Sequence, residues 1–170
     1  MKALHAIGGE AGLRELVSQF YDLMETLPEA SNLRRLHARG HGLDHARSEL
    51  FLFLSGFMGG RRLYAEKHGH MDLKLIHAHV PVRQADADTW VLCMQRALDE
   101  EGHQGPEIVA LRAIFQRVAN MLINEIPDWE EQRFDHPIGA GKFSRATRKM
   151  SDDPCQGEMN SKRQSPEHGS

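Results

Sequence analysis

Residues 59–82 read GGRRLYAEKHGHMDLKLIHAHVPV, and Trp90 follows eight residues later. In this stretch His77 comes directly after a short apolar segment, and Pro81 limits any helix that continues beyond it. The segment therefore places His77 where its ring can face the interior of the protein. A neutral imidazole nitrogen there suits iron, copper or zinc. Taken alone, the stretch predicts a helical domain with a metal-ligating histidine.

Working outward, apolar residues recur at helical spacing and predict an all-α protein. The first long helix ends at Leu27–Pro28, and the second begins with Asp44 as its cap and stops at Gly59–Gly60. Pro106 opens the last helix, and no alternating strand or internal repeat is visible. The apolar positions are Leu13, Leu16, Val17, Phe20, Met24 and Leu27; Leu50, Phe53, Leu54 and Phe57; Ala87, Trp90, Val91, Met94, Ala97 and Leu98; and Ile108, Leu111, Phe115, Val118, Leu122 and Ile126.

The composition is that of a globular protein without a nucleic acid or membrane partner. The chain has 170 residues, 40% of them hydrophobic and 26% charged, and its formal net charge is −3. The N-terminal residues have no continuous apolar stretch that could serve as a signal peptide, and no run approaches the ~18 apolar residues of a membrane helix. Cys93 and Cys155 belong to no CxxC or CxxCH motif, which fits a reducing compartment. We therefore expect a soluble, cytoplasmic protein.

The sequence changes character near its C-terminus. From Arg133 onward it is rich in Gly, Ser, Pro and mixed charge, with few apolar residues. Such a segment buries too little surface to offset the entropy lost on ordering. We therefore expect one domain over residues 1–130 and a disordered tail over residues 131–170.

Histidine is unusually frequent, with eleven in the chain. One interpretation without a cofactor is that His37, His41 and His45 chelate a divalent metal, since their spacing would align them on one face of a helix. Gly40 and Gly42 disfavour a helix at this place. The chelate therefore stays an alternative to a ligand role for His77.

Five pieces of the sequence, together and in order, resemble the truncated haemoglobins, and specifically the second group of that family. The resemblance covers approximately residues 4–125 and implies a two-over-two helical sandwich around a non-covalent haem b with its iron. The pieces are IGGEAGLRELVSQFYDLM (7–24), LRRLH (33–37), LFLFLSGFMGG (50–60), LYAEKHGHMDLKLIHAHVPV (63–82) and DTWVLCMQRAL (88–98).

The resemblance implies a role for four side chains around the iron. His77 matches the proximal histidine, the axial ligand of the iron. Tyr21 matches the distal tyrosine that donates a hydrogen bond to the bound ligand, and Trp90 matches the tryptophan whose indole N–H points into the same pocket. His37 falls where this group has a Tyr or His that closes the distal network.

Further positions match the walls and rim of the family's haem pocket. Ala46, Leu50, Phe53 and Leu54 match residues around the porphyrin, and Leu73, Val80 and Val82 are expected to line its plane. Cationic or hydroxyl side chains suit the haem propionates. The candidates for these contacts are Arg62, Tyr64 and Lys74.

The expected ligands are O2, NO and CO. Distal donors stabilise the partial negative charge on bound oxygen, so three of them predict slow oxygen release and a redox or NO/O2 detoxification role rather than transport. An enzyme of this kind, such as an NO dioxygenase or peroxidase, would take electrons from a separate donor. The alternative is a binding protein or sensor for a diatomic ligand or sulfide, without turnover.

Overall fold

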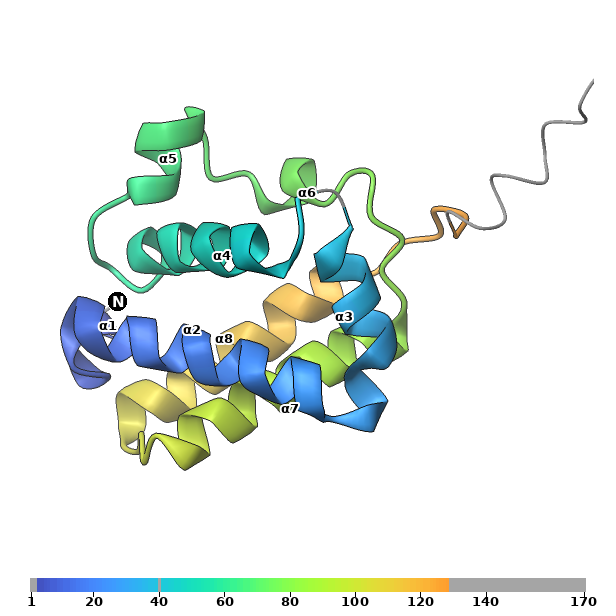
Figure 1. Ribbon diagram of the computed structural model, residues 1–170. Coiled ribbons are helices and arrows are strands. Elements are labelled where there is room, and N and C mark those ends of the chain that lie inside the picture. Colours follow the sequence, from blue (N-terminus) through green and yellow to red (C-terminus); the bar gives the residue numbers. More distant parts are fainter. Residues whose placement is uncertain (1–2, 40, 129–170) are drawn as a thin grey trace, which may run out of the picture. The chain divides into compact units, whose positions relative to one another are not determined.

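The computed structural model describes residues 3–39 and 41–128 of the chain. Every regular element in this part is helical, which confirms the predicted all-α class (Figure 1). No helix within these residues is both long and apolar enough to cross a membrane. The tail predicted over residues 131–170 lies outside the described residues.

Four long helices carry the predicted apolar positions, and shorter elements connect them. The long helices are α2 (Gly9–Thr26), α4 (Leu43–Phe57), α7 (Gln84–Glu100) and α8 (Pro106–Met121). The shorter elements are α1 (Ala3–Ala6), the 3₁₀ turn η1 (Pro28–Ala30), α3 (Ser31–Ala38), α5 (Leu63–His68) and α6 (Leu73–Ile76).

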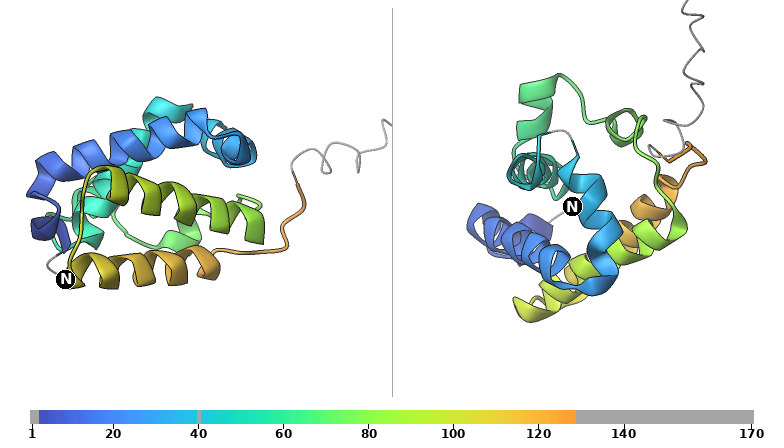
Figure 2. Two further views of the ribbon diagram at one scale, coloured as in Figure 1. Left: turned by 90° about the horizontal axis from the view of Figure 1, so that it is seen from below. Right: turned by 45° about the vertical axis from the view of Figure 1, so that its right-hand side comes forward.

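The long helices form two pairs, α2 with α4 and α7 with α8, and the pairs pack on each other through α2 and α7. In Figure 1, α4 lies above α2, α7 runs beneath α2, and α8 passes behind α2. Helix α2 contacts both α4 and α7, and α7 packs on α8. The connection over residues 101–105 is short, so α7 and α8 are antiparallel neighbours (Figure 2, left). Fully buried side chains join the pairs, among them Leu16, Phe20, Met94, Leu98 and Leu111.

Two helix ends differ from the sequence-based expectation. Asp44 is not the cap of α4: the cap residue is Gly42, whose φ of 85° turns the chain into the helix. Asp44 lies in the first turn, where a negative charge is favourable near the N-terminus. Helix α8 ends at Met121 rather than continuing to Ile126, because the backbone N–H of Asn124 bonds to the carbonyl of Val82 at 3.0 Å instead of continuing the helix.

Other ends follow the prediction. Helix α2 stops at Thr26, just before Leu27–Pro28, and α8 begins at Pro106. After α4, Gly59 takes a φ of 96°, in the left-handed region that favours glycine. The turn at Gly59–Gly60 thus ends the helix.

Candidate haem site

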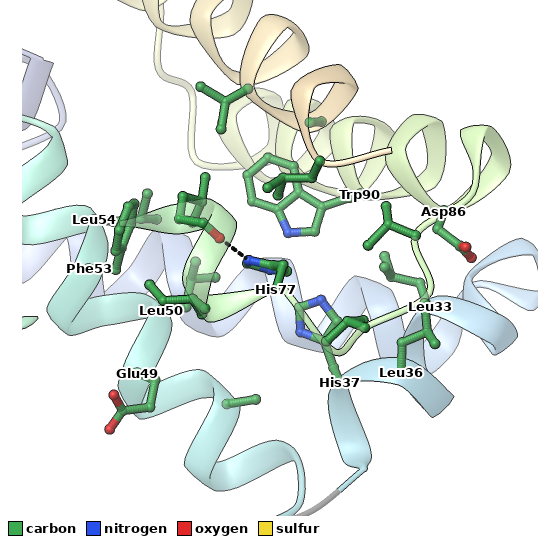
Figure 3. Close-up of a pocket in the computed structure, with 18 of the residues that line it drawn as sticks. Leu33, Leu36, His37, Glu49, Leu50, Phe53, Leu54, His77, Asp86 and Trp90 are labelled. Atoms are coloured by element: carbon green, nitrogen blue, oxygen red, sulfur yellow. Dashed lines mark hydrogen bonds between the residues drawn. The ribbon is translucent and has the colours of Figure 1, made fainter. Parts of the chain in front are cut away.

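A cavity of about 390 Å³ opens between α3, α4, α6, α7 and α8. Its walls are mainly aliphatic and aromatic, as an apolar cofactor requires. The positions expected to line the haem all border it: Ala46, Leu50, Phe53, Leu54, Leu73, Val80 and Val82. Figure 3 labels Leu50, Phe53 and Leu54 among them.

His77 lies at the C-terminal end of α6 and borders the cavity. Its Nδ1–H donates to the carbonyl of Leu73 at 2.9 Å, the dashed line in Figure 3. Burial lowers the pKa of His77 more than this hydrogen bond raises it, so the ring is neutral at pH 7. With the hydrogen on Nδ1, the lone pair of Nε2 is left for a metal.

Tyr21 and His37 form a hydrogen-bonded pair on another wall of the cavity. Tyr21 comes from α2 and His37 from α3, and Tyr21 Oη lies 3.1 Å from His37 Nδ1. Burial raises the pKa of Tyr21 above its usual range, and only Arg47 opposes the shift. Burial, with the nearby His77, lowers the pKa of His37 to about 4. Both rings are therefore neutral at pH 7.

Trp90 comes from α7 and completes the polar side of the cavity. Figure 3 shows its indole nitrogen on the side of the ring that faces His77 and His37. Two phenylalanines hold the ring: Phe20 lies 5.4 Å and Phe115 5.5 Å from it, between centroids. These tilted and edge-on contacts set the direction of the indole N–H.

Phe20 and Phe115 were not among the predicted site residues. Each lies in an apolar helical stripe, which predicts burial and does not distinguish core from pocket wall. Phe20 also packs edge-on against Tyr21, at 5.1 Å between centroids. One buried ring thus supports two of the polar groups of the site.

Imidazole and charged side chains border one rim of the cavity. Arg39, His41 and His45 come from the connection between α3 and α4 and the first turn of α4. The rings of His41 and His45 lie 4.8 Å apart between centroids. Among residues 3–39 and 41–128, no three histidine, cysteine or carboxylate side chains gather to hold a metal. The alternative three-histidine chelate is therefore not formed, since α3 ends at Ala38 and α4 begins at Leu43.

Glu49 ties α4 to α5 at the cavity. Lys67 Nζ donates to its Oε1 at 2.5 Å, and His68 Nε2 lies 2.6 Å from its Oε2. Burial alone would raise the pKa of Glu49, but the hydrogen bonds and charges of Lys67 and His68 hold it below its usual value. No local sequence pattern signals this contact.

Of the three predicted candidates for the propionate contacts, one borders the cavity and two do not. Tyr64 borders the cavity and packs against Phe53 at 5.6 Å and His68 at 4.4 Å, between centroids. Arg62 and Lys74 are exposed and do not border it. Arg62 lies just before α5, and Lys74 lies within α6.

These residues fit a haem. The cavity has apolar walls, an imidazole whose Nε2 is left for iron, and polar hydrogen-bonding groups on another wall. Cys93, the cysteine within the described residues, is fully buried and does not border the cavity. Non-covalent binding matches this arrangement.

Comparison with known proteins also indicates a haem protein. The family model of the bacterial-like globins matches residues 2–124. The group 2 truncated hemoglobin YjbI of Bacillus subtilis (strain 168) is 31% identical over 117 residues, which are 69% of this chain and 85% of that protein.

Two solved structures show the same fold. The group II 2-on-2 hemoglobin of Agrobacterium tumefaciens has a TM-score of 0.68 and 36% identity, over 74% of this chain and 96% of that chain. The truncated oxygen-avid haemoglobin of Bacillus subtilis has a TM-score of 0.64 and 29% identity, over 73% of this chain and all (100%) of that chain. The chain therefore belongs to the bacterial-like globins, as a group II truncated haemoglobin that binds haem and its iron non-covalently.

Proposed function

We propose that His77 is the axial ligand of the haem iron and that Tyr21, His37 and Trp90 bind a diatomic ligand, with O2 as the main one. The observation that carries this proposal is the Tyr21–His37 pair, 3.1 Å apart and facing the same cavity as His77. When bound, haem supplies a ferrous iron that binds diatomic ligands and transfers electron density to them. The chain's own residues then decide how long the ligand stays.

The Tyr21–His37 pair keeps one hydrogen for the ligand in either tautomer. Two neutral rings carry two polar hydrogens, one on the hydroxyl and one on the imidazole. If Tyr21 donates to Nδ1, His37 carries its hydrogen on Nε2. If His37 donates from Nδ1, the Tyr21 hydroxyl hydrogen is available instead. In either tautomer the pair can therefore orient one donor toward the ligand.

Trp90 adds a second donor in a site from which apolar walls exclude water. A hydrogen bond to a charged acceptor contributes about 1.5–3 kcal/mol. Two such donors predict slow O2 release, which suits chemistry on O2 better than transport. The oxygen-avid haemoglobin of Bacillus subtilis, a relative by fold, supports this interpretation.

The reaction we propose is the conversion of NO and O2 to nitrate. One NO, one O2 and one electron from ferrous iron give one nitrate ion, and a flavin-containing reductase that uses NAD(P)H must return the electron. Donors from Tyr21 and Trp90 favour this reaction because they stabilise negative charge on oxygen. Tyr64, Arg39, His41 and His45 are the candidates for the propionates, since all four border the cavity.

Stopped-flow mixing of the oxygenated protein with NO tests the proposal. We expect one nitrate per haem in a single turnover, and repeated turnover when NADH and a flavin reductase are added. The Tyr21→Phe variant should lose oxygen faster and yield less nitrate. Displacement of O2 by NO without nitrate would contradict the enzymatic role and favour a binding protein.

A further inference from the structure

The segment that carries His77 is only weakly held by helix packing, since Leu73 and Ile76 of α6 are no more than partly buried. Helix α6 has four residues, and none of them is buried. A single turn of this length is unstable on its own in water. Something outside α6 must therefore hold the loop over residues 77–83 in place.

That support comes from the chain that leaves α8. In Figure 1 this chain, drawn in orange, runs beside the green segment that follows α6. The side-chain Nδ2 of Asn124 donates to the carbonyl of Val80 at 3.0 Å, and its backbone N–H donates to the carbonyl of Val82 at 3.0 Å. Val80 and Val82 both border the haem cavity.

All the polar groups of Asn124 are used. Nδ2 also donates to the carbonyl of Leu122 at 3.2 Å, and Oδ1 accepts from the backbone N–H of Ile126 at 3.1 Å. The backbone carbonyl accepts from Arg83 Nη1 at 2.8 Å. Because each partner is either a donor or an acceptor, they determine the orientation of the amide.

Arg83 holds the same segment from the other side. Its guanidinium donates to the carbonyls of Asn124 and Ile126, at 2.8 and 2.6 Å, and its backbone N–H donates to Asp86 Oδ2 at 2.9 Å. Asp86 is buried and accepts from Asn32 Nδ2 at the start of α3, at 2.5 Å. The loop is therefore tied both to the end of α8 and to the buried start of α7.

A short chain of hydrogen bonds leads from Asn124 to the imidazole. Nδ2 of Asn124 holds the carbonyl of Val80, and the backbone N–H of Val80 donates to the carbonyl of His77 at 3.0 Å. The backbone N–H and Nδ1–H of His77 both donate to the carbonyl of Leu73, at 3.2 and 2.9 Å. The direction of Nε2 thus depends on where Val80 is held.

We propose that Asn124 is a positioning residue for His77: its side-chain amide holds Val80 and so sets the direction in which the imidazole presents Nε2. This inference rests on the proposed role of His77 as iron ligand. Outer partners of this kind orient a metal ligand, and their loss costs about 10–100-fold in metal affinity.

The test removes the side-chain N–H donor of Asn124 and keeps its side-chain oxygen acceptor. Asn124→Asp removes the Nδ2 donor to Val80 and keeps an oxygen for the N–H of Ile126. The matched control is Asn120→Asp, because Asn120 is exposed and lies on the last turn of α8, where its Oδ1 accepts a hydrogen bond from Gln116 Nε2 of the same helix at 3.2 Å. Full-length holoprotein is used, with the iron–histidine stretching band of the ferrous form and the rate of haem loss to apomyoglobin as measurements.

We expect Asn124→Asp to shift or broaden the iron–histidine band and to speed haem loss about tenfold. Arg83→Met, which loosens the segment without touching Val80, should give a smaller change in the same direction. A general loss of stability would lower the melting temperature without moving the band. Asn120→Asp should leave both measurements unchanged.

An unchanged band and rate in Asn124→Asp would overturn the inference, as would equal changes in Asn124→Asp and Asn120→Asp. His77→Ala, measured beside them, separates this result from the role of His77. If His77→Ala keeps the band of the parent protein, the proposed ligand is wrong. If it loses the band while Asn124→Asp keeps it, only the positioning role fails.

Discussion

Tyr21 and His77 border the same cavity but are held by different means. Tyr21 lies in the middle of an 18-residue helix, is 1% exposed and packs edge-on against Phe20. His77 follows a four-residue helix without a buried residue and is held by hydrogen bonds to Leu73 and, through Val80, to Asn124. One side of the site is positioned by packing and the other by hydrogen bonds from side chains to backbone carbonyls. Substitutions should therefore act differently on the two sides.

The largest effect is expected from His77→Ala. Since no packed core depends on α6, the domain should stay folded while the proposed axial ligand is lost. Loss of a residue that only orients a metal ligand can lower the affinity by about 100-fold. We expect loss of the ligand itself to lower the haem affinity by more than that. Visible spectra of the ferric, ferrous and CO forms measure this.

His79→Ala is the control for that variant, since His79 is exposed and does not border the cavity. Added imidazole should restore the spectrum of His77→Gly. A His77→Ala protein with the parent's ferrous and CO spectra would show that another residue binds the iron.

Phe20→Ala tests the packed side. Phe20 is fully buried and contacts both Tyr21 and Trp90, so the variant leaves a cavity beneath both. The free energy of unfolding should fall by about 3–5 kcal/mol, measured by urea titration. Val109→Ala, at a side chain that is 68% exposed, should change it by less than about 0.5 kcal/mol. Similar losses in the two variants would mean that packing around Phe20 does not hold this side.

Tyr21→Phe removes a polar group while the packing stays. We expect O2 to dissociate about 10–100-fold faster, because one hydrogen bond to a charged acceptor is lost, and the melting temperature to change little. Laser photolysis and stopped-flow kinetics measure the rate. The matched control is Tyr64→Phe, the other tyrosine of the chain and also a cavity residue. An equal rate change in both variants would contradict a specific role for Tyr21.

The smallest effect concerns Glu49 and its contacts to α5. The pKa of Glu49 is lowered in the folded protein, so the carboxylate stabilises the fold at neutral pH, and this contribution is lost as pH falls below the ordinary value of 4.5. Because Lys67 is half exposed, Glu49→Gln should cost only about 0.5–1 kcal/mol at pH 7.

Urea titrations of the parent protein and Glu49→Gln between about pH 3 and pH 7, which spans the ordinary carboxyl pKa, test whether the stabilising contribution of Glu49 is lost in acid. The difference between parent and variant should shrink as the solution becomes acidic. A difference that grows toward low pH would show that the carboxylate is not stabilised in the folded state.

The Tyr21 side of the cavity was easier to predict than the His77 side. Helical periodicity places Phe20, Tyr21 and Trp90 on long helices, and the resemblance supplied the polar roles of Tyr21, His37 and Trp90. The structure brings all of them to one cavity with His77. The contacts of Asn124 were not predictable, since its partner Val80 lies 44 residues away in the chain. A helix was expected to continue through that position, and the hydrogen bonds to the loop ended it.

The sequence by itself determined the helical class, the C-terminal end of α2, the start of α8 and the histidine that follows α6. Those features depend on neighbours within a few residues, through the helical repeat, proline and glycine. Only the tertiary structure decided that Tyr21 meets His37, that Glu49 meets His68 and that Asn124 holds Val80. These are directional contacts between distant segments, and they form only once the packing of α2, α4, α7 and α8 has brought the polar groups within about 3 Å of each other.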